Sequence, residues 1–572
     1  MIFDFYQQLK DFYHATHPGR LDWITQNRLK IKSQRSQAAK TAVENGRQPG
    51  RKKLLFWSTT SWERGGMEHM LAYAMALRGH AVHGVTCSGG FSTCSMDTVK
   101  SPRPDCDYCH KRNAKLLDVF GLNPLCTATS DLISQEKIKS LEDEVMSLSP
   151  EAFAKYSYRG IDIGRLVSRD LPQYFFRITD LADPQIRAQV FKALHATAVY
   201  AECAYEMVGQ FSPDIGMVTS GKTVSFSPFY EVCRKLGIPV ITWDESGYEK
   251  DGYVFKVNQF ANEYHLEDAW EMARDQPLTM EQKYLTRCCL DKTRKGDVGL
   301  TVLYKNFIEN HDSIRTLLGL DPQKKLVVLL ANITWDTSSL GRDVAFPGMF
   351  EWICATIDFF RSRPDRQLVI RCHPSEGHVP VFIRSDEKIS DKIMAKYGAL
   401  PAHIKVVAGE SNLKSHELCE MSDLILVYTT FVGLEMAVQG RRVVVCGAAH
   451  YRNKGFTVDV AHAKEYAEIL GHDGTCGDKQ LDEPSIELAW RYAHMFINRV
   501  QVYLPEFDME HRHIYNIDDP SDFLPGRSTR WDRLCENVEK LGLFLDCTPL
   551  SLARVEGRLA QVQKMHAVEE TS

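Results

Sequence analysis

The stretch KKLLFWSTTSWERGGMEHMLAYAMALRGHAVHGVTCSGG, residues 52–90, predicts the fold class of this chain. Leu54 to Trp57 form the apolar run of a buried strand, a polar loop with two glycines follows, and Met67 to Leu77 have the spacing of an amphipathic helix. Gly79 is suited to end that helix, and Ala81 to Val85 predict a second strand. A strand, a helix and a second strand in this order form the unit from which parallel α/β sheets are built.

The same alternation returns in two later series. The first has strands in SPDIGMVTSG (212–221) and IPVITWDESG (238–247), with a helix between them. The second runs from the strand in KKLVVLLANITW (324–335) to the strand in RVVVCGAAH (442–450). We therefore predict two facing, doubly wound, Rossmann-like α/β domains, which bind ligands outside the carboxyl ends of their strands.

The predicted domain boundaries follow changes in composition and pattern. We expect an N-terminal helical and linker segment at 1–50, a first domain at 51–295 that contains a cysteine-rich loop (87–110) and a helical insertion (110–210), a second domain at 296–485, and a helical tail at 486–572.

Composition restricts the class of protein. A net charge of −5 gives no electrostatic case for a nucleic-acid partner. No apolar run approaches the roughly 20 residues that cross a bilayer, and the N-terminus lacks the apolar core of a secretory signal. We expect a cytoplasmic protein, with a peripheral position at the inner membrane as the alternative, because aromatic and basic residues mix in the first 20 residues. The 16 cysteines are then thiols or metal ligands rather than disulfides.

GMVTSGKT, residues 216–223, matches the pattern of a phosphate-binding P-loop. The pattern requires a strand before the first glycine, whereas the expected strand here, Ile215 to Thr219, contains it. We favour a strand that ends in a Ser220–Gly221 loop facing the cleft between the domains. A P-loop kinase or sulfotransferase that uses Lys222 is the alternative.

Asp244 and Glu245 follow the strand Val240 to Trp243 in the first domain. Paired carboxylates at a strand end are well placed for proton abstraction when the cleft raises one of their pKa values. A solvated acidic turn is the other interpretation.

Polar residues end several strands of the second domain. In LVIRCHPSEG (368–377), Pro374 cannot continue the strand, so His373 is expected at its mouth, either as a functional or as a structural residue. Thr429 or Thr430 can cap the following helix and leave its backbone N–H groups for an anion, or serve only as a cap. Glu435 lies in reach of a ribose hydroxyl.

Two further strand ends add charged groups. Lys454 and Gly455 in HYRNKGFTVD would bring positive charge to the same cleft, and ANITWDTS places Asp336 after the first strand of the second domain.

Four cysteines are spaced C-x6-C-x11-C-x2-C, namely Cys87, Cys94, Cys106 and Cys109. This clustering suits a closed tetrahedral site with a structural role, for Zn²⁺ first and an iron–sulfur cluster second, with His83 and His110 as substitute ligands. Ordinary loop thiols are the alternative.

CHPSEG, VYTTFVGLEMAVQGRRVVVCG, YRNKGFT and DESG together resemble bacterial glycosyltransferases of the GT-B fold. The nearest resemblance is to capsule polysaccharide biosynthesis proteins, which include the Kdo transferases of capsule assembly, and CMP-sialic-acid transferases are more distantly similar. The resemblance is strongest over residues 325–460 and weaker over 54–110 and 212–260. In this chain Ser246 separates the two acids from Gly247, which leaves the identity of the catalytic base open.

The resemblance implies a nucleotide-sugar donor, CMP-linked by preference or UDP-linked, and a growing surface polysaccharide or glycolipid as acceptor. His373 would contact the phosphate, and Asp244 or Glu245 would deprotonate the acceptor or stabilise the transition state, with no cofactor needed for catalysis. A non-catalytic scaffold of a polysaccharide-assembly complex is a further alternative. The expected donor-binding residues are Arg371, Pro374, Glu376, Tyr428, Thr429, Thr430, Gly433, Glu435, Lys454, Gly455, Ser220, Gly221 and Asp336.

Overall fold

The computed structural model describes most of the chain. The described residues are 50–59, 67–89, 91–94, 106, 110, 113–114, 117, 120–175, 181–246, 252–295, 307–336, 339–379, 385–471, 480–504, 507–508, 514–515 and 523–545. Apart from Gly50, the N-terminal segment expected at 1–50 lies outside them. None of the described helices is both long and apolar enough to cross a membrane.

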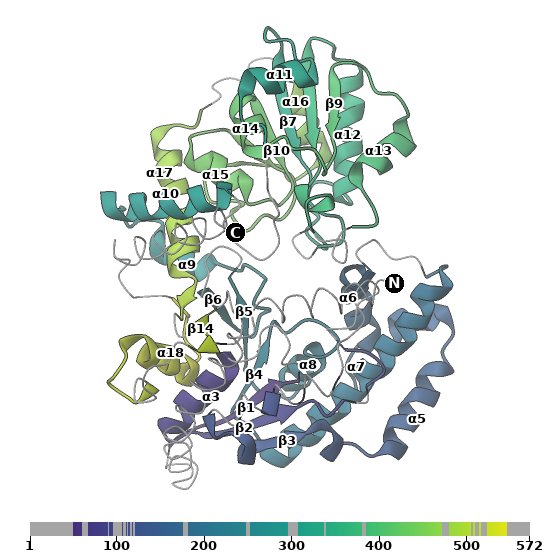
Figure 1. Ribbon diagram of the computed structural model, residues 1–572, viewed down its shortest axis with the longest axis vertical. Helices are drawn as coiled ribbons and strands as arrows, with labels where there is room; N and C mark the ends of the chain where they lie inside the picture. The colour runs from purple at the N-terminus through teal and green to yellow at the C-terminus, as the bar shows by residue number, and fades with distance from the viewer. Residues whose placement is uncertain are drawn as a thin grey trace, which may run out of the picture.

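The first domain is built on a seven-stranded sheet with the order β13-β6-β5-β4-β1-β2-β3 (Figure 1). Its strands are β1 (Lys53–Ser58), β2 (Ala81–Thr86), β3 (Cys126–Ala128), β4 (Ile215–Thr219), β5 (Val240–Glu245), β6 (Gly252–Val257) and β13 (Val502–Tyr503). Strands β1 to β5 run parallel, whereas β6 and β13 are antiparallel additions beyond β5. The strand order reverses between β1 and β4, which is the topological switch point of this domain.

Helices cover both faces of this sheet. They are α3 (Met67–Leu77), α5 (Gln135–Met146), α6 (Ile163–Phe175), α7 (Pro184–Phe211), α8 (Ser227–Lys235) and α18 (Thr529–Lys540). Helices α5, α6 and α7 confirm the helical character expected for residues 110–210. That stretch also supplies β3, which pairs in parallel with β2, so it is part of the sheet as well as an insertion.

The second domain has a six-stranded, fully parallel sheet with the order β12-β11-β10-β7-β8-β9. Its strands are β7 (Lys325–Leu330), β8 (Arg366–Arg371), β9 (Ile404–Val407), β10 (Leu424–Val427), β11 (Val443–Val445) and β12 (Val458–Asp459). The flanking helices are α11 (His311–Leu318), α12 (Met349–Arg361), α13 (Ile389–Tyr397), α14 (Ser415–Met421), α15 (Val432–Val438) and α16 (Ala463–Gly471). Apolar clusters fill both faces of this sheet, as expected for parallel strands buried on both sides. The two doubly wound domains predicted from the sequence are confirmed.

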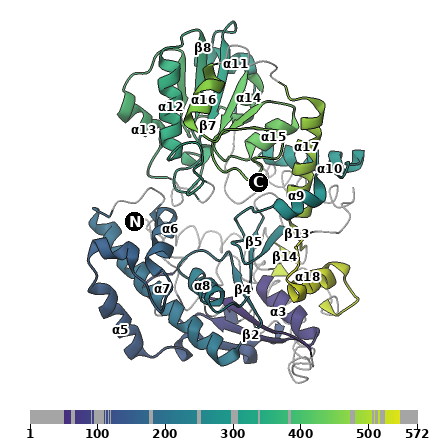
Figure 2. The same ribbon diagram turned by 180° about the vertical axis from the view of Figure 1, so that it is seen from behind.

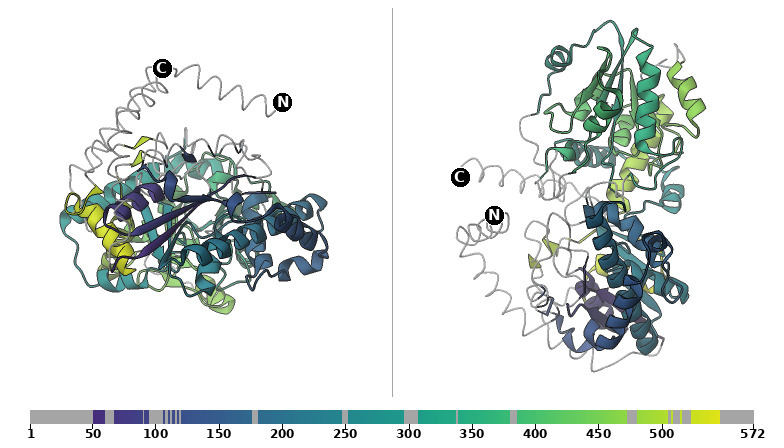
Figure 3. Two further views of the ribbon diagram at one scale, coloured as in Figure 1. Left: turned by 90° about the horizontal axis from the view of Figure 1, so that it is seen from below. Right: turned by 90° about the vertical axis from the view of Figure 1, so that its right-hand side faces the viewer.

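The chain passes between the domains on one side of the molecule, through α9 (Glu267–Ala273), α10 (Met280–Lys295), α17 (Glu483–His494) and a π-helix (Met495–Arg499) (Figures 1 and 2). Figure 3 shows the two domains as lobes stacked on either side of these elements. Rings from both domains pack at the junction, where Tyr264 lies 5.2 Å from His450 and 5.1 Å from Phe496 between centroids.

The segment after residue 485 differs from the helical tail that we expected. After α17 the chain returns to the first domain, where β13 pairs with β6 through Val502 and Tyr253. A short hairpin of β14 (Phe507–Asp508) and β15 (Ile514–Tyr515) follows, and α18 packs on α3. A two-residue strand carries no periodicity, so this return could not be predicted from the sequence pattern.

Candidate functional site

A cavity of about 300 Å³ lies at the topological switch point of the second domain. The segments at the carboxyl ends of β7 and β8 and the start of α15 contribute residues to its lining. Its lining includes Leu330, Ala331, Arg371, Cys372, His373, Pro374, Lys414, Ser415, His416, Thr430 and Val432, together with Arg294, Phe307 and Glu309. This is the place at which open α/β sheets bind ligands.

His373 lies two residues after the last residue of β8, at the mouth of the strand as the sequence predicted. A one-turn helix at Pro374–Glu376 begins after His373. Nδ1 of the His373 ring accepts the backbone N–H of Ser375 at 3.1 Å. The pKa of His373 is lowered to about 4. Burial is the largest cause, the charge of Asp336 raises the pKa, and the charge of Arg371 lowers it. The ring is therefore neutral at physiological pH. Because Nδ1 accepts a hydrogen bond, the proton sits on Nε2, which makes that atom a hydrogen-bond donor.

The turn after β10 is hydrogen-bonded to the loop after β7, the neighbouring strand at the switch point. The amide of Thr429 donates to Asn332 Oδ1 at 3.3 Å, and the carbonyl of Thr430 accepts the hydroxyl of Tyr451 at 2.7 Å. The expectation that Thr429 or Thr430 caps the helix is wrong, because α15 has Phe431 at its N-cap and no side chain caps it. Thr430 lines the cavity nonetheless.

Glu435 lies in the first turn of α15 and is almost fully buried. Its Oε2 is 2.8 Å from Nε2 of His416, and its Oε1 has no hydrogen-bond partner among the described residues. His416 was not predicted from the sequence, because neither the α14 segment nor the α15 segment alone indicates that the two helices pack together.

Glu435 and His416 line a second cavity of about 210 Å³ that shares two residues, Arg294 and His416, with the first. Its lining is Arg287, Leu290, Asp291, Arg294, His416, Glu435, Val438, Gln439 and Trp490. The shared residues place the two cavities side by side.

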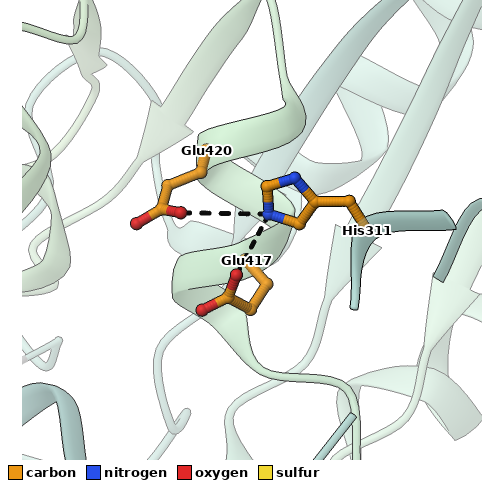
Figure 4. A group of neighbouring side chains, drawn as sticks. All are labelled: His311, Glu417 and Glu420. Carbon is orange, nitrogen blue, oxygen red and sulfur yellow. Dashed lines mark hydrogen bonds and ion pairs between the residues drawn. The ribbon is translucent and has the colours of Figure 1, made fainter. Parts of the chain in front are cut away.

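Arg294 also belongs to an ion network with His311, Glu417 and Glu420. Figure 4 shows the last three of these side chains. Nε2 of His311 lies 3.0 Å from Glu417 and 3.8 Å from Glu420, and Nη2 of Arg294 lies 2.6 Å and 2.9 Å from the same two carboxylates. His311, Glu417 and Glu420 have the donor atoms of a cation site. The guanidinium of Arg294 contacts both carboxylates and neutralises one of their two charges, so we assign this network to holding the cavity wall.

Three of the expected donor-binding residues use their polar groups within the protein. Arg371 donates to the carbonyls of Ala408 and Ser411, and the hydroxyl of Tyr428 donates to Asp343. Glu376 is 1% exposed, and its Oε1 accepts the amide of Ile389 at 3.2 Å. These groups support the loops of the cavity.

Asp244 and Asp336 come from opposite domains to one region. The pKa of Tyr264 is raised to about 12. Burial is the largest cause. The charges of Asp244 and Asp336 also raise this pKa, and the charge of Arg342 lowers it. Asp244 is the last residue but one of β5 in the first domain and is 9% exposed, and Glu245 is the last residue of that strand. Because successive strand residues point to opposite faces, only one of these two acids faces a given side. The charge of Asp336 also raises the pKa of His373. This carboxylate therefore lies near His373 of the second domain and near Tyr264 of the first.

The GMVTSGKT segment does not form a P-loop. Strand β4 contains Gly216, and α8 begins at Ser227 rather than at Lys222. Ser220 and Gly221 instead form a turn with φ of 57° and 78° after the strand, as we favoured.

The Lys454 side chain forms an ion pair with Glu267 of α9, at 3.4 Å, and Gly455 beside it has φ of 90°. This predicted donor-binding lysine thus connects the two domains.

The described part of the cysteine-rich loop turns at Gly89. The amide of Gly89 donates to Cys87 Sγ at 3.3 Å, and a Cβ at Gly89 would lie 3.2 Å from the ring of His110 and 3.4 Å from Cys106 Cβ. Burial is the largest cause that raises the pKa of Tyr200, and Cys87 and Cys94 lie near enough to raise it further when they are ionised. Cys109 lies outside the described residues.

Comparison with known proteins matches the second domain. Residues 309–471 match the family model of capsule polysaccharide biosynthesis proteins, which confirms the resemblance over that region. No curated protein of similar sequence is found.

Several solved structures are similar in outline. A beta Kdo 2,4 transferase, KpsC of Thermosulfurimonas dismutans, is 12% identical over 52% of this chain and 87% of its own, with a TM-score of 0.31. A beta Kdo 2,7 transferase KpsC of the same organism is 12% identical over 50% and 79%, with a TM-score of 0.28. The glycotransferase of kitacinnamycin is 10% identical over 86% and 99%, with a TM-score of 0.24. At these identities and scores the likenesses carry no argument about substrates.

Proposed function

We propose that this chain, whose second domain matches capsule polysaccharide biosynthesis proteins over residues 309–471, is a glycosyltransferase. It moves a sugar from a nucleotide-sugar donor to a growing surface polysaccharide or glycolipid. The donor is CMP-linked by preference, with UDP-linked donors as the alternative. The observation that carries the proposal is the cavity at the switch point of the second domain, with the Nε2–H of His373 in its lining.

His373 suits a phosphate contact. A neutral ring that donates from Nε2 stabilises the negative charge that develops on a leaving phosphate, and it costs no proton transfer from solvent. Thr430 and Lys414 line the same cavity and would provide a hydroxyl and a positive charge. Lys414 shares that charge with Glu309, whose Oε1 lies 2.6 Å from its Nζ. No metal ion is required for this step, because these groups supply the neutralisation.

Glu435 suits the sugar hydroxyls of the nucleoside. Its Oε1 is buried and has no partner among the described residues, and an unpaired buried acceptor costs roughly 1–3 kcal/mol. A ribose hydroxyl that donates to Oε1 would remove this cost, while His416 fixes the carboxylate from the other side.

Asp244 is our candidate for the base that deprotonates the acceptor. It is the last residue but one of a strand of the first domain and acts on Tyr264 together with Asp336 of the second, so it belongs to the wall opposite the donor. Glu245 stays the alternative base. In this arrangement the base removes the proton from the acceptor hydroxyl, the sugar carbon forms its bond to that oxygen, and the bond to the donor phosphate breaks.

The first test is the melting temperature of the purified protein with CMP, CDP, UDP, GDP, ADP and ATP. A ligand that binds only the folded state at about 100 times its dissociation constant stabilises it by roughly 2.7 kcal/mol, which raises the melting temperature by several degrees. A shift with cytidine nucleotides supports a CMP-linked donor, and a shift with UDP supports the alternative donor. A shift with adenine nucleotides alone contradicts the proposal. No shift with any of the nucleotides also contradicts it and favours a scaffold.

We also propose a structural zinc ion at Cys87, Cys94, Cys106 and Cys109. The position of Cys106 and His110 against the turn at Gly89 supports this site. Elemental analysis should find about one zinc per chain, and Cys106→Ser should lower both the zinc content and the melting temperature. Full zinc content in that variant would exclude Cys106 as a ligand.

A further inference from the structure

The residue after the two acids of β5 is hydrogen-bonded to a segment far along the chain. Ser246 follows Asp244 and Glu245, and its hydroxyl donates to Oε1 of Gln501, just before β13. Gln501 is 5% exposed. The backbone amide of Ser246 donates to the carbonyl of Gly252 at 2.8 Å. Both the side chain and the backbone of Ser246 are therefore fixed.

Gln501 is held on its other side by the π-helix, residues Met495–Arg499, of the segment that arrives from the second domain. Its Nε2 donates to the carbonyl of Phe496 at 3.2 Å. The side-chain amide thus bridges two segments, because its oxygen accepts from Ser246 while its nitrogen donates to Phe496. π-Helices are rare and are frequent at functional sites.

Phe496 connects this bridge to the donor cavity. Its ring stacks on the ring of His450 of the second domain, with 4.2 Å between centroids, and lies 5.7 Å from the ring of Phe431. Phe431 stands between Thr430 and Val432, which both line the donor cavity. A continuous set of contacts therefore runs from the donor cavity, through the π-helix and Gln501, to the acids of the first domain.

The orientation of the acids depends on the backbone at this strand end. Oδ1 of Asp244 accepts the backbone amide of Glu245 at 2.9 Å, so the carboxylate follows the peptide that leads to Ser246. Strand β6 holds this peptide from one side, where Glu245 pairs with Tyr253. The bond from Ser246 to Gln501 holds it at the end. Precise placement matters here, because a displacement of about 1 Å can lower a reaction rate about 10²-fold.

We propose that Gln501 is a positioning residue for the base of the transfer reaction, and that it acts through Ser246 on the strand end that carries Asp244 and Glu245. The inference rests on the proposed glycosyltransferase function and adds the residues that orient its base. It also gives a role to the serine that separates the two acids from Gly247 in this chain. The hydroxyl of that serine is the group that Gln501 holds.

Amide hydrogen exchange of the full chain tests the anchoring without any ligand. Gln501→Met keeps the size of the side chain and removes both hydrogen bonds, and Ser246→Ala removes the hydroxyl alone. In both variants the amides of residues 244–246 should exchange at least about tenfold faster, because local opening becomes easier. The amides of β4 should exchange as they do in the unaltered protein.

Steady-state kinetics then test the role in the reaction, with the CMP- or UDP-linked sugar whose nucleotide raises the melting temperature. Gln501→Met and Ser246→Ala should each lower kcat at least about tenfold and leave KM for the donor within about twofold. Ser246→Thr keeps the hydroxyl and should restore most of kcat. The double variant should lose no more than either single variant, because both changes break one bond.

The matched control is Thr286→Val, which removes a different buried contact of the same π-helix. Thr286 is fully buried, and its Oγ1 accepts Nδ2 of Asn498 at 3.0 Å. This variant should lower the melting temperature, as Gln501→Met does, because both lose buried hydrogen bonds. It should leave kcat and the exchange of residues 244–246 unchanged.

Three results would overturn the inference: unchanged exchange at residues 244–246 in Gln501→Met, unchanged kcat in both Gln501→Met and Ser246→Ala, or an equal loss of kcat in Thr286→Val. Lower kcat with an intact nucleotide melting shift supports it. Failure of the proposed function would instead appear in the unaltered protein, as the lack of both a nucleotide shift and sugar transfer. The two failures are therefore distinguishable.

Discussion

His373 is the side chain that we propose to contact the phosphate of the donor. Replacing it with alanine removes the Nε2–H from the cavity while Pro374 and the short helix after it keep the turn. We expect transfer to fall about 10²- to 10³-fold, as for loss of one donor to a developing negative charge, with a melting temperature within a few degrees of the unaltered protein. A transferase assay and a melting curve measure the two effects.

The control for this variant is His403→Ala. His403 is in the same domain, and its Nε2 contacts the carbonyl of Phe360 at 2.8 Å, away from the cavity lining. It should retain activity. Because the pKa of His373 is about 4, its ionisation should add no limb to the pH–rate profile between pH 5.5 and 8. A lost activity that follows a titration near pH 6.5 would contradict the neutral-donor role.

Glu376 predicts a pH-dependent stability. Burial raises its pKa to about 7, whereas a glutamate in an unfolded chain ionises near pH 4.3. Between these values the folded protein keeps a proton that the unfolded chain has lost, so the free energy of unfolding falls as pH rises through this window. Glu376→Gln cannot ionise. It should melt a few degrees higher than the unaltered protein at pH 8 and at nearly the same temperature at pH 4.5.

Glu468→Gln serves as the control for this pair of measurements. Glu468 is exposed on α16, so its replacement should leave the difference between pH 4.5 and pH 8 unchanged. A Glu376→Gln variant with the same pH dependence as the unaltered protein would show that Glu376 is ionised in the fold.

At the scale of elements, the turn between β10 and α15 depends on a glycine. A Cβ at Gly433 would lie 2.1 Å from the hydroxyl of Tyr451, which donates to the carbonyl of Thr430. Gly433→Ala therefore forces α15 away from Tyr451 and displaces Thr430. We expect a loss of about 1–3 kcal/mol in stability, typical of an overpacked core, and a reduced nucleotide shift, both read from melting curves.

Gly209→Ala is the matched glycine control. Gly209 lies in α7, and a Cβ there would meet nothing within 4 Å. In a helix interior this change should stabilise the protein by roughly 0.5–1 kcal/mol. If Gly433→Ala behaved like Gly209→Ala, the close approach of Tyr451 would not restrict this turn.

The elements themselves were largely predictable from periodicity, because buried parallel strands are continuous apolar runs. As expected, Thr429 and Thr430 lie between a strand, Leu424–Val427, and a helix, Val432–Val438. The cap of that helix was not predictable. Capping depends on the backbone angles of the turn, and here they put Phe431 rather than a threonine at the boundary.

The candidate site was predictable only in part, for a related reason. His373 was found because a proline after an apolar run marks a strand end. His416 was missed, since it acquires its role from a partner distant in sequence, Glu435. Arg371 and Tyr428 were assigned to the ligand because the sequence cannot show that nearby carbonyl or carboxylate groups already occupy them.

At the scale of the molecule, the first domain depends on residues near the other end of the chain. Trp531 of α18 is fully buried in the same apolar cluster as Tyr73 of α3. Trp531→Ala should destabilise the first domain by about 3–5 kcal/mol, while the nucleotide shift of the second domain persists. Circular dichroism melting and the nucleotide titration measure the two domains separately.

Leu524→Ala provides the comparison, since Leu524 is 37% exposed in the same segment. It should change stability by less than about 1 kcal/mol. Equal stability of the Trp531→Ala and Leu524→Ala variants would show that α18 is not part of the first-domain core.

The return of the chain through β13 also sets an order of assembly during synthesis. The sheet that starts at β1 receives its last strand only from residues 502–503, after every residue of the second domain has been translated. A domain usually completes its fold as it leaves the ribosome, N-terminal part first. Here the edge of β6 stays unpaired through the whole translation of the second domain. The first domain to be synthesised is thus the last to be finished, and for that interval the edge of β6 is open to mispairing.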